Sequence, residues 1–248
     1  MSRPLKRYIA PLITALALGL AGCAQAPVAD GFSDPYEEQN RKRFERTIKV
    51  DRAVLRPVAF AYGESVPEPV RRRVSNFSAN LGVPGSFVND VLQANVDDAA
   101  HNFMRFLINT TIGIGGIFDP ATSFGLTARD ADFGETMHVW GIAEGHYVVL
   151  PLLGPSTQRD AVGSVVDLFT NPLGYVIPTP ERYAMPATGT LSKLGERYRF
   201  DATIESILHD SADPYAQARL LYLESRRFAL GGEQAEESYD DYEDFYSD

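Results

Sequence analysis

The side chain with the clearest covalent chemistry in this chain is Cys23, its only cysteine. It follows Leu20, Ala21 and Gly22 at the end of an apolar N-terminal stretch. This is the position at which bacterial lipoproteins carry the acylated cysteine of a lipobox, and the alternative is an ordinary signal peptide with a chance cysteine. Each buried methylene of an acyl chain contributes roughly 0.8 kcal/mol, so several chains on Cys23 hold a protein stably at a membrane. We expect lipidation at Cys23.

The residues before this cysteine have the three parts of a secretion signal. A basic start with Arg3, Lys6 and Arg7 precedes a mostly apolar stretch over 8–19, and small residues close the segment. The apolar stretch is shorter than the roughly 20 residues that span a bilayer. We therefore expect a signal peptide over residues 1–22 and a lipidated linker over 23–33. Ala24 favours the outer membrane, because an Asp at that position is the usual signal for retention in the inner membrane.

Histidine and carboxylate side chains are the next candidates for chemistry, and their spacing argues against an enzyme. The four histidines are His101, His138, His146 and His209, and the sequence has no H-E-x-x-H pair. Glu135 and His138 can share one face of a helix, but zinc needs at least three protein ligands. The sequence also lacks a G-x-S-x-G elbow and a phosphate-binding loop. We expect a protein without catalytic activity and without a cofactor.

The charge balance excludes a class of partners. Without the signal segment, 20 of the 23 basic residues remain against 33 acidic ones. Non-specific nucleic-acid binding depends on basic patches, so we expect no nucleic-acid partner. The last segment, residues 232–248, carries eight acidic residues and no Lys or Arg, which predicts a disordered, solvated tail.

The elements that must position any site are predicted to be mainly helical. Asp-Pro pairs at 34–35, 119–120 and 213–214 are typical of helix N-termini, with turns as the alternative. Apolar spacing predicts further helices, with an interruption at Pro57 and a stop at Gly82. The predicted helical ranges are 35–50, a segment to 62, 70–81, 87–92, 95–110, 133–140, 157–169, parts of 191–208, and 214–230.

The middle of the chain has a different character. Residues 133–154 contain the only tryptophan, Trp140, and glycines at 134, 141, 145 and 154. The segment 141–145 is predicted to be a flexible turn, and 147–153 a short strand or an extended apolar piece. The proline-rich stretch 171–186 is predicted to be irregular. Few period-two runs occur, so the fold class is mainly α with few or no strands.

From Asp34 to about Leu230 the chain resembles the MlaA family, also called VacJ. The resemblance lies in many ordered blocks rather than in one motif, which makes coincidence improbable. The blocks are Asp34-Pro35-x-Glu37-x-x-Asn40-Arg41, Leu55-Arg56-Pro57-Val58-Ala59, Val74-Ser75-Asn76-Phe77 with Asn80-Leu81, Arg105-Phe106-x-x-Asn109-Thr110-Thr111-x-Gly113-x-Gly115-Gly116, Phe133-Gly134-x-Thr136, Trp140-Gly141-x-x-x-Gly145-x-Tyr147, Leu150-Pro151-Leu152-Leu153-Gly154-Pro155-Ser156, Arg159-Asp160 and Asp213-Pro214-Tyr215.

The resemblance implies a fold, a function and partners. It implies a ring-like, multi-helix domain over 34–231 that lies in the periplasmic leaflet of the outer membrane. It also implies an amphipathic channel that removes mislocalised phospholipids from the outer leaflet, passes them to a periplasmic carrier of the MlaC type, and so maintains lipid asymmetry. A trimeric porin is the implied outer-membrane partner. A porin-binding structural lipoprotein without its own channel is the alternative.

The resemblance also implies a channel-gating hairpin, and the block from Trp140 to Tyr147 corresponds to it. Gly141 and Gly145 are its candidate hinges, since glycine adopts backbone conformations that other residues avoid. The alternative is that these two glycines only form a tight turn. The sequence leaves both interpretations open. The candidate site residues are thus Cys23 for lipidation and Trp140, Gly141, Gly145 and Tyr147 for the gate.

Overall fold

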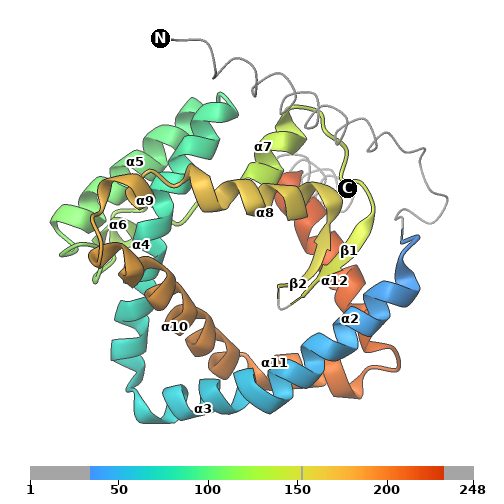
Figure 1. The fold of residues 1–248 in the computed structure, drawn as a ribbon. Coiled ribbons are helices and arrows are strands. Elements are labelled where there is room, and N and C mark those ends of the chain that lie inside the picture. The colour runs from blue at the N-terminus through green and yellow to red at the C-terminus, as the bar shows by residue number, and fades with distance from the viewer. Residues whose placement is uncertain (1–33, 152, 232–248) are drawn as a thin grey trace, which may run out of the picture.

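The computed structural model describes residues 34–151 and 153–231, and most of them are helical. The predicted signal peptide, Cys23 with its linker, and the acidic tail lie outside the described residues. Figure 1 shows helices that follow one another round a closed ring, with a two-stranded hairpin on one side. The prediction of a mainly α, ring-like, multi-helix body with few strands is confirmed for this part of the chain.

The first side of the ring is one nearly continuous helical stretch. It contains α2 (Glu37–Val50), a π-helical turn η1 (Asp51–Leu55) and α3 (Arg56–Ser65). The predicted interruption at Pro57 takes the form of this π turn, in which the N–H of Arg56 donates to the carbonyl oxygen of Asp51 five residues earlier. Pro57 lacks an N–H, and the π turn directly before it places this loss where the α-helical hydrogen-bond pattern is already interrupted.

The second side is formed by α4 (Glu68–Leu92), which packs against α5 (Val96–Thr111). The predicted stop at Gly82 is wrong, because α4 continues through both Gly82 and Pro84 to Leu92. A proline inside a helix removes one backbone hydrogen bond, and packing against other helices outweighs that loss here. Pro84 is buried, and α4 contacts α5, α7, α8 and α10 along its length.

The remaining sides contain short elements and the only sheet of the described residues. They are α6 (Pro120–Ser123), α7 (Phe133–Val139), β1 (Tyr147–Leu150), β2 (Gly154–Thr157) and α8 (Gln158–Thr170). The strands are antiparallel, with Tyr147 opposite Thr157 and Leu150 opposite Gly154. Of the two alternatives for 147–153, the strand is therefore confirmed. The stretch 171–186 is less irregular than predicted, since it holds α9 (Leu173–Val176), the 3-10 turn η2 (Glu181–Tyr183) and the start of α10.

The ring closes through α10 (Ala184–Arg199), α11 (Asp201–Glu205), the π-helical turn η3 (Ser206–Asp210) and α12 (Pro214–Leu230). α10 packs against both α3 and α4 and thereby braces two sides of the ring. Gly63 in α3 makes this approach possible, because a Cβ atom there would lie 2.2 Å from Cγ of Tyr198. Two ion pairs of Arg197, to Asp51 and to Asp201, join the same region.

Two of the three Asp-Pro pairs cap helices as predicted. The side chain of Asp119 accepts a hydrogen bond from the N–H of Thr122, and that of Asp213 accepts one from the N–H of Ala216. Asp34 does not cap a helix, because α2 begins only at Glu37 and its N-cap is Tyr36. The buried carboxylate of Asp34 is instead an acceptor for side chains from α2 and α12, namely Asn40, Tyr215 and Arg219.

The interior of the described part is unusually polar. Its buried apolar residues are outnumbered by buried polar and charged ones. The main apolar cluster is Phe44, Tyr147, Val149, Tyr215 and Leu223. The buried polar residues are Asn40, Asn80, Ser86, Asn89, Asp90, Asn102, Arg105, Asn109, Thr136, Ser156, Thr157, Arg159 and Asp160. Buried polar groups destabilise a fold unless they are hydrogen-bonded, so their pairing must position the elements of the ring.

Large apolar side chains are, in contrast, abundant on the surface. Phe228 is 66% exposed and Phe103 is 51% exposed, although both are large hydrophobic residues. The described part of α5 and its following loop alone exposes several more, namely Val96, Met104, Leu107, Ile112, Ile114 and Phe118. Soluble monomers rarely expose so much contiguous apolar surface, so this surface predicts an apolar environment or partner.

No helix within the described ranges has the length and apolar character needed to cross a membrane.

The side chain of Asn40 connects α2 to the hairpin. β2 pairs with one edge of β1, and Asn40 satisfies two groups at the other edge. Its Nδ2 donates to the carbonyl oxygen of Tyr147 at 3.1 Å, and its Oδ1 accepts from the N–H of Val149 at 3.0 Å. Asn40 is fully buried, so these bonds have no competition from solvent.

We predict that Asn40→Leu destabilises the fold strongly, although the two side chains have the same branched shape. The substitution leaves the carbonyl of Tyr147 and the N–H of Val149 buried without partners, and each such group costs about 1–3 kcal/mol. The free energy of unfolding should fall by about 2–4 kcal/mol in denaturant titrations. Gln39→Leu, at the exposed neighbouring position, is the control. Equal stability of the two variants would show that Asn40 does not hold the hairpin.

Candidate functional site

A cavity of about 670 Å³ lies where the hairpin, α8, α10 and α12 face one another. We call it the central cavity, since these elements border the opening of the ring in Figure 1. Its apolar lining comes mainly from the hairpin and α8, and its polar lining from four separate segments. The apolar residues are Leu150, Pro151, Leu153, Pro155, Ala161, Val165 and Leu168, and the polar ones are Asp132, Ser156, Asp160, Ser164, Asp167, Lys193, Tyr222 and Arg226.

The polar side of the central cavity is organised by Arg226 of α12. Its guanidinium donates to both carboxylate oxygens of Asp132 at 2.7 and 2.8 Å and to both of Asp160 at 3.1 Å. Burial alone raises the pKa of Asp160, but hydrogen bonds from Arg226 and Tyr222 outweigh burial and hold the pKa below its usual value. Asp160 is therefore ionised at neutral pH, and Arg226 links α12 to α8 and to the residue that caps α7.

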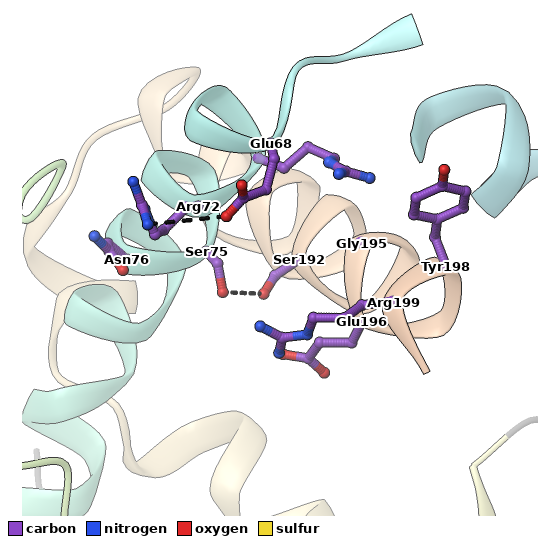
Figure 2. Close-up of a pocket in the computed structure, with 10 residues that line it drawn as sticks. Glu68, Arg72, Ser75, Asn76, Ser192, Gly195, Glu196, Tyr198 and Arg199 are labelled. Atoms are coloured by element: carbon purple, nitrogen blue, oxygen red, sulfur yellow. Dashed lines mark hydrogen bonds and ion pairs between the residues drawn. The ribbon is translucent and has the colours of Figure 1, made fainter. Parts of the chain in front are cut away.

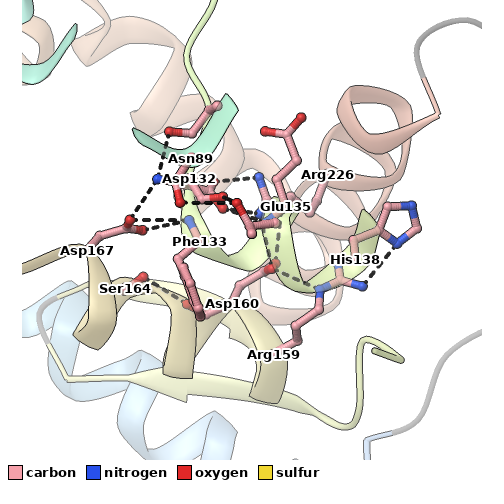
Figure 3. Close-up of polar contacts among 12 residues, drawn as sticks. Asn89, Asp132, Phe133, Glu135, His138, Arg159, Asp160, Ser164, Asp167 and Arg226 are labelled. Atoms are coloured by element: carbon pink, nitrogen blue, oxygen red, sulfur yellow. Dashed lines mark hydrogen bonds and ion pairs between the residues drawn. The ribbon is translucent and has the colours of Figure 1, made fainter. Parts of the chain in front are cut away.

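Asp167 completes this arrangement on the α8 side, as Figure 3 shows. Its carboxylate accepts from the backbone N–H of Phe133 at 3.1 Å and from Nδ2 of Asn89 at 3.1 Å. The three carboxylates of the cavity are thus all held by fixed donors. Lys193 of α10 differs, because it is exposed and forms no ion pair with any described residue. It is the one lysine that lines the cavity.

A second pocket, of about 960 Å³, lies between α7 and the end of α12, and we call it the α7–α12 pocket. The connection from α7 to β1, residues 141–144, forms one of its walls. An ion pair of 2.6 Å between Glu144 and Arg227 joins this connection to α12, and Asp98 of the lining pairs at 2.6 Å with Arg129. The charged and histidine residues that line it are Asp98, Glu135, His138, Glu144, Arg159 and Arg227.

A third pocket, of about 400 Å³, lies between α4 and α10 (Figure 2). The hydroxyl groups of Ser75 and Ser192 are 3.0 Å apart and join the two helices. The Cζ atom of Arg71 lies 4.8 Å from the centroid of the Tyr198 ring, within the roughly 6 Å over which a cation–π contact is favourable. This pocket lies where α10 braces α4, and its contacts rigidify the ring.

The four residues predicted to form a gate do not lie together. Trp140 ends α7 and is half exposed, and its Nε1 donates to the carbonyl oxygen of Leu92 at 3.1 Å. Tyr147 begins β1, is 1% exposed and packs against Tyr215 and Tyr222. Trp140 therefore lies at the surface, whereas Tyr147 belongs to the apolar cluster of the fold.

The two predicted hinge glycines both adopt backbone conformations that favour glycine. Gly141 has φ +81° and open space around its Cα, whereas Gly145 has φ +72° and faces Gln158. A Cβ atom on Gly145 would lie 2.8 Å from Oε1 of Gln158. Both glycines are thus required by local geometry, and their role as hinges of a gate stays a prediction.

The predicted gate block, Trp140–Tyr147, ends at the first residue of the two paired strands. Residues 141–146 form the connection from α7 to β1, and β1 (Tyr147–Leu150) pairs with β2 (Gly154–Thr157) as an antiparallel hairpin. It is this hairpin, through Leu150, Pro151 and Leu153, that borders the central cavity. The block was assigned to the gate from the family resemblance, and that assignment stays a prediction.

Sequence patterns missed most of the cavity lining. Asp160 lies in one of the blocks that resemble the family, and Asp132 precedes a predicted helix, so both carried a signal. For Lys193 and Arg226, nothing in the sequence indicated a place in the cavity beyond their positive charge. Within the described residues no group of three His, Cys, Asp or Glu side chains is arranged to hold a metal ion.

Glu135 generates a prediction on pH dependence. Burial, followed by the negative charge of Asp132, raises the pKa of Glu135 from 4.5 to about 7. Because the folded-state pKa lies above the unfolded-state value, ionisation of Glu135 costs stability, which is lost as pH rises from 4.5 through about 7.

We expect Glu135→Gln to be more stable than the parent chain at about pH 8, by roughly 1–2 kcal/mol after allowance for solvent screening. The difference should disappear at about pH 4, where the carboxyl is protonated in both states. Urea titrations at the two pH values measure it, with the exposed Glu45→Gln as control. A stability difference that is the same at both pH values would contradict the assignment.

Comparisons with known proteins identify the family. The family model described as MlaA lipoprotein matches residues 32–229. The intermembrane phospholipid transport system lipoprotein MlaA of Escherichia coli K12 is 34% identical over 232 residues, which are 89% of this chain and 90% of the relative. The protein of the same name from Haemophilus influenzae is 30% identical and covers 92% of this chain and 93% of its own length.

A further relative and a solved structure agree with this match. An uncharacterized protein of Rickettsia felis is 38% identical over 75% of this chain and 73% of its own length. A solved structure, described as the structural basis for maintenance of bacterial outer membrane lipid asymmetry, aligns with a TM-score of 0.67 and 32% identity over 80% of this chain and 99% of that chain. The resemblance inferred from the ordered blocks is thereby confirmed, and this chain belongs to the MlaA lipoprotein family.

Proposed function

We propose that this protein moves phospholipids through its central cavity as a component of intermembrane phospholipid transport. The observation that carries the proposal is the amphipathic lining of that cavity at the opening of the ring. The names of the Escherichia coli and Haemophilus influenzae relatives support the transported class, because both are phospholipid transport lipoproteins. The proposal includes no chemical reaction and no cofactor.

The lining suits both parts of a phospholipid. A charged head group costs several kcal/mol to bury in hydrocarbon without polar partners, and the polar wall with Lys193 offers such partners. The acyl chains need apolar contact along the same path, and Leu150, Leu153 and Leu168 provide it. Ion pairs between Arg226 and its two carboxylate partners keep the polar wall in place without a bound lipid.

The outer surface supports a position within a lipid leaflet. Exposed apolar side chains occur on α3, α5, α8 and α12, and in water this surface favours aggregation. Hydrocarbon around the ring removes that cost, since apolar side chains need no water-excluding partner there. We propose that the body lies in the periplasmic leaflet of the outer membrane. Membership of a lipoprotein family supports the membrane association.

The transport task and the partners follow from the family. We propose that the protein removes mislocalised phospholipids from the outer leaflet and passes them to a periplasmic carrier of the MlaC type. A trimeric porin is the proposed neighbour in the outer membrane. The exposed apolar surface offers area for such a neighbour as well as for lipid.

The test of the transport proposal is charge reversal at the one unpaired lysine of the cavity. Lys193→Glu adds a fourth carboxylate to the lining and repels a lipid phosphate, so outer-leaflet phospholipid should rise severalfold in cells whose only copy is the variant. Labelling of surface-exposed phospholipid measures this level. Lys49→Glu, at an exposed site on α2, makes the same charge change away from the cavity and should leave the level unchanged.

Equal lipid levels for Lys193→Glu, Lys49→Glu and the parent chain, all at equal abundance, would contradict transport through this cavity. That result would favour the alternative of a lipoprotein that only binds a porin.

A separate prediction concerns the anchor. We propose that Cys23 is triacylated, which gives more than the two chains that stable anchoring needs. Mass spectrometry of a Cys23→Ala variant should show no acyl groups, and more of the protein should appear in the soluble fraction. A portion should remain membrane-bound if the apolar surface of the ring is itself embedded. An acylated Cys23→Ala variant would show that another residue is the anchor.

A further inference from the structure

The α7–α12 pocket contains a buried guanidinium whose hydrogen bonding is incomplete. The side chain of Arg159 is only 3% exposed, and its Nη2 has no hydrogen-bond partner among the described residues. Its other contacts are long: Nε lies 3.4 Å from Oδ1 of Asp160, and Nη1 lies 3.3 Å from both Nδ1 of His138 and the carbonyl oxygen of Ile142. Figure 3 shows the guanidinium directed toward the ring of His138.

Of the carboxyl groups around Arg159, Asp160, Glu144 and Asp98 are engaged elsewhere. Glu135, which lines the same pocket, is partly protonated at neutral pH, because burial raises its pKa to about 7. Asp160 accepts shorter bonds from Arg226 and from the hydroxyl of Tyr222, at 3.1 and 2.6 Å. Glu144 pairs with Arg227, and Asp98 pairs with Arg129, both at 2.6 Å. A buried charged donor without a full set of acceptors is costly, so a small rotation of the Arg159 side chain that brings the buried Nη2 to an acceptor in the pocket would be favourable.

His138 supplies a second donor to the same pocket. Arginine only donates, so the contact from Nη1 of Arg159 requires that Nδ1 of His138 accepts and carries no proton. Burial, followed by the positive charge of Arg159, lowers the pKa of His138 below its usual value of 6.5, so the ring is neutral at neutral pH. The remaining proton is therefore on Nε2, and His138 is exposed toward the pocket that it lines.

We propose that the α7–α12 pocket binds a phosphate group through Arg159 and His138. A phosphate presents several acceptor oxygens in different directions, which suits two donors on separate helices better than one planar carboxylate does. Apolar residues of the same pocket, among them Val139, Ile142 and Leu230, suit the glycerol or acyl portion of a phosphate ester. The source of the phosphate is either a phospholipid head group or a soluble phosphate.

The site is placed to influence the connection between α7 and β1. The backbone N–H of Arg159 donates to the carbonyl oxygen of Glu144 at 3.1 Å, and its guanidinium contacts the carbonyl oxygen of Ile142. A phosphate that holds Arg159 therefore also restrains the segment between Gly141 and Gly145. If a lipid supplies the phosphate, the site deepens the proposed transport function. Binding itself does not depend on transport through the central cavity.

The experiment is a titration of the full-length, lipidated protein in detergent micelles, with histidine NMR signals as the readout. The three probes are inorganic phosphate, glycerol 3-phosphate, and micelles that contain phosphatidylglycerol. We expect a saturable shift of the His138 signal with at least one probe and no saturable shift of the His101 signal. His101 is the matched control, since its Nε2 contacts the carbonyl oxygen of Thr127 outside the phosphate-binding residues.

Two variants test the donors, with tryptophan fluorescence quenching as a readout that does not need His138. His138→Gln should weaken binding about tenfold, the effect expected for one hydrogen bond to a charged group, whereas His101→Gln should leave the affinity unchanged. Arg159→Met should abolish saturable binding. Arg159 is buried, so its substitution can affect folding as well as binding. The affinity of the exposed His138→Gln variant is therefore the result that tests the phosphate site.

The outcomes distinguish the two sources of the phosphate, and they test the phosphate site independently of the transport proposal. Saturation with the soluble probes alone assigns a soluble phosphate, and saturation with the lipid alone assigns a head group. The absence of a saturable His138 shift with all three probes, or an unchanged affinity in His138→Gln, would overturn the phosphate site. Neither result bears on Lys193→Glu, which tests the central cavity in cells.

Discussion

The structure depends on paired polar side chains that join segments far apart in the sequence. Arg226 pairs with Asp132 and Asp160, and Asn40 holds the free edge of β1. A ring has little interior volume per residue, so it cannot bury a large apolar core, and these pairs take over the role of a core. Removing one partner of a buried ion pair leaves an unpaired charge that costs about 3–5 kcal/mol, so each pair fixes the position of its elements firmly.

The same constraint explains why the molecule is polar inside and apolar outside. Side chains that pair across the ring place carboxylates and guanidinium groups toward its centre, where they line the central cavity. Some large apolar side chains of the hairpin and α8 line the same cavity, and many others lie exposed on the surface. In water, exposed apolar side chains favour aggregation. Among acyl chains, the same side chains are in a favourable environment. Cavity lining and outer surface thus support the same proposal through one physical cause.

This distribution also shows which features the sequence could predict. Helix starts at Asp119, Thr157 and Asp213 were predictable, because a cap and its helix lie within three residues of each other. The continuation of α4 through Pro84 was not, because contacts with helices distant in the sequence determine it. The position of the hairpin depends on the pairing of Asn40 with residues more than 100 positions later. Lys193 reaches the cavity only because α10 packs against α3 and α4, and no local pattern encodes that packing.

The blocks that identify the family acquire a physical meaning from these contacts. Asn40, Arg105, Asn109 and Asp160 lie in the blocks, and each is buried and bonded to a segment that is not its sequence neighbour. A polar pair needs both of its partners at fixed positions, whereas a surface toward lipid accepts many apolar residues of similar size. The blocks therefore combine residues that hold the ring together with residues that line its cavities, among them Leu150, Leu153 and Arg159. Lys193 and His138 also line the cavities but lie outside the blocks, so the full set of groups offered to a head group follows from cavity geometry and not from the family blocks alone.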